Sequence, residues 1–128
     1  MRRYLLDASA ILAFMSNEPG GDKVRAVIQA GQAGVTAINI SEVAAKLVAR
    51  GLSSVAAEFQ CRSMGLDILE TDEGIAFAAA ALVPFTQPLG LSLGDRVCLA
   101  TAAREGCIAM TADKAWASVQ GVNVEVIR

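Results

Sequence analysis

Short apolar runs alternate along this chain with longer segments in which hydrophobic residues recur every three or four positions. The short runs are typical of buried strands, and the longer segments are typical of helices with one buried face. Gly51, Gly65 and Gly106 end three of the helical segments, whereas Pro84 and Pro88 indicate a loop. The pattern predicts strands at residues 3–6, 34–36, 66–69, 107–110 and 122–127, and helices at residues 8–15, 22–29, 38–50, 53–63, 72–82, 92–105 and 113–118.

Strands that alternate with helices in this way form a mostly parallel sheet with helices on both faces, joined by right-handed crossovers. The length of 128 residues suits one compact domain. We therefore predict an α/β fold with a single domain at residues 1–128. Because no apolar run approaches the roughly 20 residues of a membrane-spanning helix, no membrane association is expected.

The residue types that are absent or scarce narrow the possible chemistry. The chain has no histidine, which excludes Ser-His-Asp and Cys-His mechanisms and the usual zinc sites. Cys61, Cys98 and Cys107 form no C-x-x-C pair, which argues against a disulfide framework and favours a reducing cytoplasm. The net charge of −2 argues against tight nucleic-acid binding through a basic patch.

Four acidic residues stand at positions where a parallel sheet places its ligand site. Asp7 directly follows the first predicted strand, and Asp113 comes shortly after the fourth. Glu42 and Asp95 lie in the first turns of two predicted helices. The carboxyl ends of parallel strands and the helix starts that follow them meet at the same edge, where ligands bind. We therefore expect the four carboxylates to converge.

A cluster of like charges is unfavourable unless a cation neutralises it. Hard divalent cations prefer oxygen ligands, so the sequence predicts Mg²⁺, with Mn²⁺ as a substitute, in preference to zinc. One or two such ions activate water and stabilise the charge that develops during phosphodiester cleavage. The acidic set therefore points to a metal-dependent reaction at a phosphodiester.

Several of these residues also fit a purely structural role. Asp7 has the weakest such alternative, because an acid between a buried strand and an apolar helix serves no packing need. Trp116 is predicted to belong to the core or to a lid. The structural alternatives for the other acids are capping boxes for Ser92 with Asp95 and for Asn39 with Glu42, an ion pair between Glu42 and Lys46, and a turn at Asp113.

The segments that carry these acids resemble, in order and spacing, the motifs of PIN-domain ribonucleases, and in particular those of the VapC-type toxins of bacterial toxin–antitoxin pairs. The resemblance covers essentially the full length of the chain. It implies a PIN-like three-layer α/β/α fold with a central, mostly parallel sheet. The matching segments are LDASA at 6–10, NISEV at 39–43, LSLGDRVCLA at 91–100 and MTADKAW at 110–116.

The resemblance also implies which residues act and on what. Members of this family cleave structured RNA such as tRNA or ribosomal RNA, usually as homodimers, and a cognate antitoxin silences them. An RNA substrate, a VapB-like antitoxin and a homodimer are therefore expected here. The implied metal-binding and catalytic residues are Asp7, Glu42, Asp95 and Asp113, and the implied supporting hydroxyls, which orient the acids or water, are those of Ser9 and Thr111.

The resulting hypothesis is a cytoplasmic Mg²⁺- or Mn²⁺-dependent endoribonuclease that acts as the toxin of a toxin–antitoxin pair. Asp7, Asp95 and Asp113 would hold the ion, and Glu42 would hold a second ion or orient water. Two alternatives remain open, a housekeeping PIN nuclease without an antitoxin and a non-catalytic PIN-like binding module. The candidate contacts for substrate phosphate are Arg96 and Lys114, which adjoin two of the acids.

Overall fold

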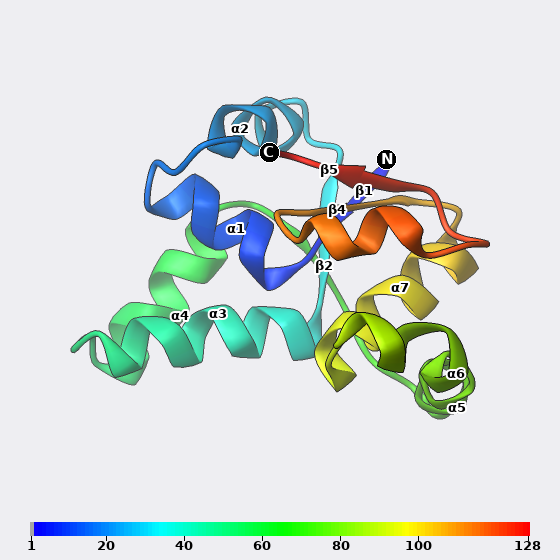
Figure 1. Cartoon of the computed structure of the whole chain (residues 1–128). Helices are drawn as coiled ribbons and strands as arrows, with labels where there is room; N and C mark the ends of the chain where they lie inside the picture. The colour runs from blue at the N-terminus through cyan, green and yellow to red at the C-terminus, as the bar shows by residue number, and fades with distance from the viewer. Residues whose placement is uncertain (1) are drawn as a thin grey trace.

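The computed structural model describes residues 2–128 and contains a five-stranded sheet with helices on both faces (Figure 1). Residue 1, with which the predicted domain begins, lies outside the described residues. The strands are β1 (Tyr4–Leu6), β2 (Ala33–Thr36), β3 (Asp67–Leu69), β4 (Ile108–Thr111) and β5 (Val124–Val126). The helices are α1 (Ala8–Met15), α2 (Gly21–Gln29), α3 (Ala37–Ala49), α4 (Ser54–Ser63), α5 (Glu73–Ala81), α6 (Val83–Thr86) and α7 (Leu93–Glu105), with 3₁₀ turns η1 (Gln87–Leu89) and η2 (Lys114–Ser118).

The strand order is β3-β2-β1-β4-β5, and every pairing is parallel. Successive residues of a strand point to opposite faces of the sheet, and each face has its own hydrophobic core. Neighbouring residues of β1 therefore belong to different cores. Leu6 packs with Met110 and helices α1 to α4, whereas Leu5 packs with Ala109, α7 and η2. The predicted three-layer α/β/α fold is therefore confirmed, and it brings the carboxyl ends of β1 and β4 side by side at one edge.

Most helix starts are capped by side chains that accept hydrogen bonds from backbone N–H groups, whereas α2, α6 and η1 begin without such a bond. The predicted helices and strands are confirmed, with ends that differ by one or two residues. The prediction of a loop at Pro84 and Pro88 is wrong, because this segment forms α6 and η1. Each proline lies in the first two positions of its helix, where its missing N–H has no intrahelical partner. The capping side chains are Asp7, Thr36, Ser53, Asp72, Ser92 and, for η2, Asp113.

The core accounts for two expectations about individual side chains. Trp116 is fully buried against the sheet face covered by α7, which confirms its assignment to the core. The three cysteines are buried free thiols, as the absence of a disulfide pattern predicted. None of the helices in residues 2–128 combines the length and the apolar character that a membrane span requires.

The contact between α1 and α2 leaves no room for a side chain at Gly21, the first residue of α2. A Cβ there would lie 2.6 Å from the carbonyl oxygen of Ala13. We expect Gly21→Ala to lower the free energy of unfolding by about 1–3 kcal/mol, because backbone must shift to relieve the overlap. Urea unfolding measures this, with Gly74→Ala in α5 as the control, since its added Cβ makes only ordinary contacts, with the Asp72 carboxylate at 3.4 Å and the Arg104 guanidinium at 3.8 Å. Equal midpoints for the two variants would contradict the prediction.

Candidate active site

Asp7 lies at the carboxyl end of β1 and caps α1. Its Oδ1 accepts a hydrogen bond of 2.8 Å from the backbone N–H of Ala10, as a helix cap does. The hydroxyl of Thr111, at the end of the neighbouring strand β4, donates to its Oδ2 over 2.6 Å. The Ser9 hydroxyl lies 2.8 and 2.9 Å from the two carboxylate oxygens. The carboxylate is thus held in one orientation although it is only 3% exposed.

The hydroxyls of Ser9 and Thr111 also connect Asp7 to the start of η2. The Ser9 Oγ accepts from the backbone N–H of Ala112 over 2.9 Å, and the Thr111 Oγ1 accepts from that of Asp113 over 3.0 Å. Each hydroxyl therefore joins the Asp7 carboxylate to the backbone that follows β4. This places both predicted supporting residues in direct contact with Asp7.

Burial raises the pKa of Asp7 from 3.8 to about 6, because a charged carboxylate loses its hydration there. Hydrogen bonds from Thr111, Ala10 and Ser9 lower this pKa, and the negative charge of Asp95 raises it. No lysine or arginine forms an ion pair with Asp7 in residues 2–128. The protein therefore keeps a buried acid whose charge it does not itself neutralise.

Glu42 is positioned by Asn39, a buried residue of α3 whose role the sequence prediction missed. The Asn39 side-chain amide donates to the Glu42 carboxylate over 2.8 Å and to the carbonyl of Gly94 in α7 over 3.2 Å. The capping box of Asn39 with Glu42, considered as a structural alternative, does not form, because Thr36 caps α3 and accepts from the Asn39 N–H. The alternative ion pair of Glu42 with Lys46 is also not formed.

Gly94 allows α3 and α7 to approach closely beside the site. A Cβ at Gly94 would lie 2.6 Å and 2.7 Å from the Glu42 carboxylate oxygens. A side chain at this position would occupy the space that the Glu42 carboxylate now fills. The sequence placed Gly94 in a motif, but its packing role depends on a contact between helices that are far apart along the chain.

Asp95 performs the structural role that was considered for it, whereas Asp113 caps a helix and does not form the turn that was considered. Asp95 forms a capping box with Ser92, in which its Oδ2 accepts from the Ser92 N–H over 2.8 Å. Asp113 caps η2 by accepting from the Ala115 N–H over 3.0 Å, and its side chain is exposed. Each of these bonds involves one oxygen of the carboxylate, so capping does not by itself exclude a further role.

The buried thiol of Cys98 lies within reach of the charges of three of the acids. Burial raises the pKa of Cys98, and the negative charges of Asp7, Asp95 and Glu42 raise it further. Cys98 lies one turn after Asp95 in α7 and faces the core. Asp113 is connected to this group through its backbone bond to Thr111. Asp7, Glu42 and Asp95 therefore all lie near Cys98, with Glu42 against Gly94 next to Asp95 and with Asp113 joined to Asp7 only through Thr111.

The two basic residues considered for substrate contact lie in different environments. Arg96 is half-buried, and its Nη1 donates to the carbonyl of Leu91 over 3.3 Å, so its guanidinium lies against the segment that precedes α7. Lys114 is exposed at the start of η2, next to Asp113. Lys114 is therefore accessible to solvent, whereas Arg96 already contacts the fold.

Comparison with known proteins identifies the family to which this fold belongs. The family model described as "PIN domain" matches residues 4–122, which is most of the chain. The chain belongs to the PIN domain family. No protein with a curated description matches it significantly.

Solved structures similar to this PIN domain share its architecture at low sequence identity. The DNA-bound VapBC complex from Salmonella typhimurium aligns with a TM-score of 0.76 at 14% identity, covering 100% of both chains. A toxin–antitoxin complex from Klebsiella pneumoniae gives 0.73 at 22% identity, with 98% of each chain covered. VapBC2 from Rickettsia felis, bound to a DNA fragment from its promoter, gives 0.72 at 13% identity and covers 95% of this chain and 96% of its own. At these identities the similarity establishes the fold.

The chemistry of the acidic residues of this PIN domain fits a hard divalent cation. All of the candidate ligands are carboxylate oxygens, and the buried Asp7 has no cationic partner in residues 2–128. Within the same residues, no three acidic or thiol side chains are arranged so that they alone would hold an ion. Mg²⁺ usually binds through one or two carboxylates and keeps several waters, so Asp7 with Asp95 is a suitable pair of first ligands.

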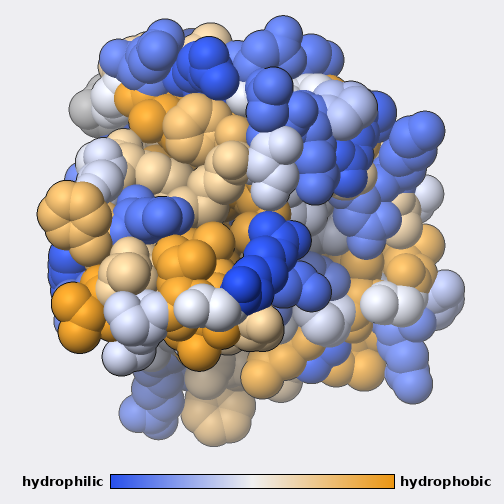
Figure 2. All heavy atoms as spheres, turned by 90° about the vertical axis from the view of Figure 1, so that its left-hand side faces the viewer, coloured by the Kyte–Doolittle hydropathy of each residue, from blue (hydrophilic) through white to orange (hydrophobic). Residues whose placement is uncertain are grey.

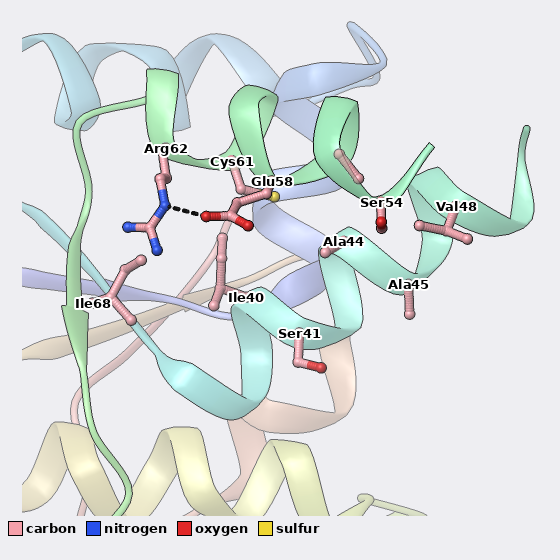
Figure 3. A pocket seen from close by; sticks show the side chains of 11 residues that line it. Ile40, Ser41, Ala44, Ala45, Val48, Ser54, Glu58, Cys61, Arg62 and Ile68 are labelled. Carbon is pink, nitrogen blue, oxygen red and sulfur yellow. Dashed lines mark hydrogen bonds and ion pairs between the residues drawn. The ribbon is translucent and has the colours of Figure 1, made fainter. Parts of the chain in front are cut away.

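A second feature of this PIN domain is an apolar groove of about 400 Å³ between α3 and α4 (Figure 3). Ile40, Ala44 and Val48 of α3 line one side, and the ion pair of Arg62 with Glu58, 2.8 Å long, lies at the α4 side. Figure 2, which views the left-hand side of Figure 1, shows apolar surface interrupted by polar surface on that face. Exposed hydrophobic side chains near the groove are Val48, Val55, Phe59 and Ile68.

Proposed function

We propose that this PIN domain is a Mg²⁺- or Mn²⁺-dependent endoribonuclease that cleaves structured RNA, tRNA or ribosomal RNA. The observation that carries the proposal is the buried, unneutralised Asp7, which lies near enough to Asp95 for the negative charge of Asp95 to act on it. The Glu42 carboxylate is held against Gly94, the residue before Asp95 in α7. Such an arrangement raises the free energy of the protein unless a cation binds, which is typical of a functional site rather than of a stabilising one. Membership of the PIN family supports a nuclease.

In this proposal Asp7 and Asp95 hold the ion, with Glu42 and Asp113 as further ligands or as acceptors for bound water. When bound, the ion activates water and stabilises the charge that develops on the phosphate. Neighbouring side chains hold the carboxylates in place. Thr111 and Ser9 orient the Asp7 carboxylate, and Asn39 orients that of Glu42. Rigid placement of this kind is what effective catalysis requires.

We further propose that the protein acts in the cytoplasm, as a homodimer, as the toxin partner of a VapB-like antitoxin. Support comes from the structural similarity to VapBC complexes over nearly the full chain, and from the three free thiols, which suit a reducing compartment. The exposed apolar side chains beside the α3–α4 groove support a protein partner, because such patches commonly mark binding surfaces.

Cleavage of end-labelled bulk tRNA and ribosomal RNA by the purified chain tests the activity. Discrete products are expected with Mg²⁺ or Mn²⁺, and none is expected with EDTA. Cleavage that persists in EDTA would contradict metal dependence. If no RNA is cleaved and Mn²⁺ does not bind by calorimetry, the non-catalytic binding module becomes the better explanation. Cleavage without toxicity on expression in cells would favour a housekeeping nuclease.

The close approach at Gly94 gives a second prediction for this activity. In Gly94→Ala the added Cβ would overlap the Glu42 carboxylate, which is the end of a flexible side chain and can move aside. We expect the cleavage rate to fall about tenfold or more, because misplacement of about 1 Å at a site costs up to about 100-fold. The urea midpoint is expected to change little. A normal rate would mean that the position of the Glu42 carboxylate does not matter.

A further inference from the structure

Glu42 is the first of three charged residues along one flank of α3. Lys46 and Arg50 follow at intervals of four residues, so on a helix they lie on the same side as Glu42, about 6 Å apart along the axis. The other sides of α3 either pack in the core or face the open groove. Asn39, Val43 and Leu47 are buried, and Ile40, Ser41, Ala44, Ala45 and Val48 line the groove toward α4 (Figure 3).

The flank of Lys46 and Arg50 leads from the acidic site toward the far end of α1. Helices α1 and α3 pack against each other, and both begin at the edge that carries Asp7 and Glu42. At the other end, the Arg50 Nη1 lies 3.5 Å from the Oγ of Ser16, the C-cap residue of α1. The two cations therefore follow the boundary between α1 and α3 away from the carboxylates.

The charges of Lys46 and Arg50 are not neutralised within the protein. In residues 2–128 the ion pairs involve other arginines, and both Lys46 and Arg50 are exposed. Like charges four residues apart on a helix repel each other, although the helix dipole favours cations near its C-terminus. A chain with a net charge of −2 thus keeps two adjacent unpaired cations beside its acidic site. The arginines in ion pairs are Arg2, Arg62, Arg104 and Arg128.

We propose that Lys46 and Arg50 bind backbone phosphates of the RNA to one side of the scissile phosphate, as substrate-positioning residues. The inference rests on the proposed nuclease function and deepens it. An ammonium and a guanidinium are suited to phosphate oxygens, and such contacts fix the register of a nucleic acid without reading its sequence. The two residues provide, in the folded protein, a local basic surface that is not visible as a basic run in the sequence.

Steady-state cleavage of bulk tRNA over a range of salt concentrations tests this role. The variant is Lys46→Gln with Arg50→Gln. The control is Arg3→Gln with Lys23→Gln, which removes the same two charge types from exposed positions before β1 and in α2. We expect KM to rise about tenfold in the α3 variant while kcat stays within about twofold, since uniform binding is lost. The slope of log(kcat/KM) against the logarithm of the salt concentration should become less negative by about 1.4, which is about 0.7 for each phosphate contact.

A conservative variant and urea unfolding distinguish a substrate-positioning role of Lys46 and Arg50 from a role in stabilising the fold. Lys46→Arg keeps the charge and should keep the KM and salt dependence of the parent, and all variants should show the parent's urea midpoint. If the α3 variant matches the control in KM and salt dependence while the parent cleaves tRNA, the inference is wrong and the proposed function stands. If the parent cleaves no RNA with either metal, the proposed function fails and the inference fails with it.

Discussion

Replacing Asp7 with Asn is expected to reduce metal-dependent RNA cleavage by at least about 100-fold, because loss of a residue that only hydrogen-bonds to a metal ligand already costs about 10–100-fold. Asn has nearly the shape of Asp and can still accept from the Ala10 N–H, so α1 keeps its cap. What is lost is the buried negative charge. Cleavage of labelled tRNA under Mg²⁺ measures the effect.

The same substitution is expected to stabilise the metal-free protein at neutral pH. The pKa of Asp7 is about 6 in the folded protein and 3.8 without burial, so the folded state binds the proton more tightly. The stability that this proton contributes is present below about pH 4 and is lost as the pH rises through about 6. At pH 7 the charged Asp7 therefore costs up to about 3 kcal/mol, which Asp7→Asn removes.

Thermal unfolding in EDTA at about pH 7 and pH 4 measures this gain. The Tm of Asp7→Asn should exceed that of the parent at pH 7, and the difference should shrink at pH 4. Asp22→Asn is a matched control, because Asp22 is an exposed acid in the first turn of α2. An Asp7→Asn protein that cleaves RNA at the parent's rate, or that is less stable than the parent at pH 7, would contradict the assignment.

Replacing Thr111 with Val is expected to weaken Mn²⁺ binding about 10–100-fold at pH 7, because residues that hydrogen-bond to a metal ligand hold that ligand in the orientation that binding needs. The substitution keeps the shape and removes the hydroxyl that donates to Asp7 and accepts from the Asp113 N–H. Its hydrogen bond is the largest of the contributions that lower the Asp7 pKa, so this pKa should rise further. Binding requires the deprotonated carboxylate and should therefore recover in part as the pH is raised.

Calorimetric titration of Thr111→Val with Mn²⁺ at about pH 6, 7 and 8 measures this loss of affinity and its recovery with pH. Thr101→Val is the control, since the buried Thr101 hydroxyl donates only to the carbonyl of Val97 in its own helix. Affinity equal to that of the parent at every pH in Thr111→Val would show that the hydroxyl does not support a metal site. A loss of equal size in the control would indicate a general effect on packing.

The order of strands and helices could be predicted from the sequence because it depends on local patterns. Hydrophobic periodicity and caps such as Ser53 and Ser92 act within a few residues, and they fixed the elements to within one or two positions. The Pro84–Pro88 segment was missed for a related reason. Proline is compatible with both a loop and the first positions of a helix, and the local sequence does not distinguish them.

The sequence by itself also determined which acids follow strands and begin helices, and hence that Asp7, Glu42 and Asp95 lie at one edge of a parallel sheet. Only the tertiary structure decided how they are held. Asn39 bridges Glu42 to Gly94 across 55 residues, and Thr111 reaches Asp7 across 104. Such contacts depend on the packing of distant segments, which local periodicity does not encode. Burial, the cause of the raised pKa of Asp7, likewise exists only when the strands and helices come together.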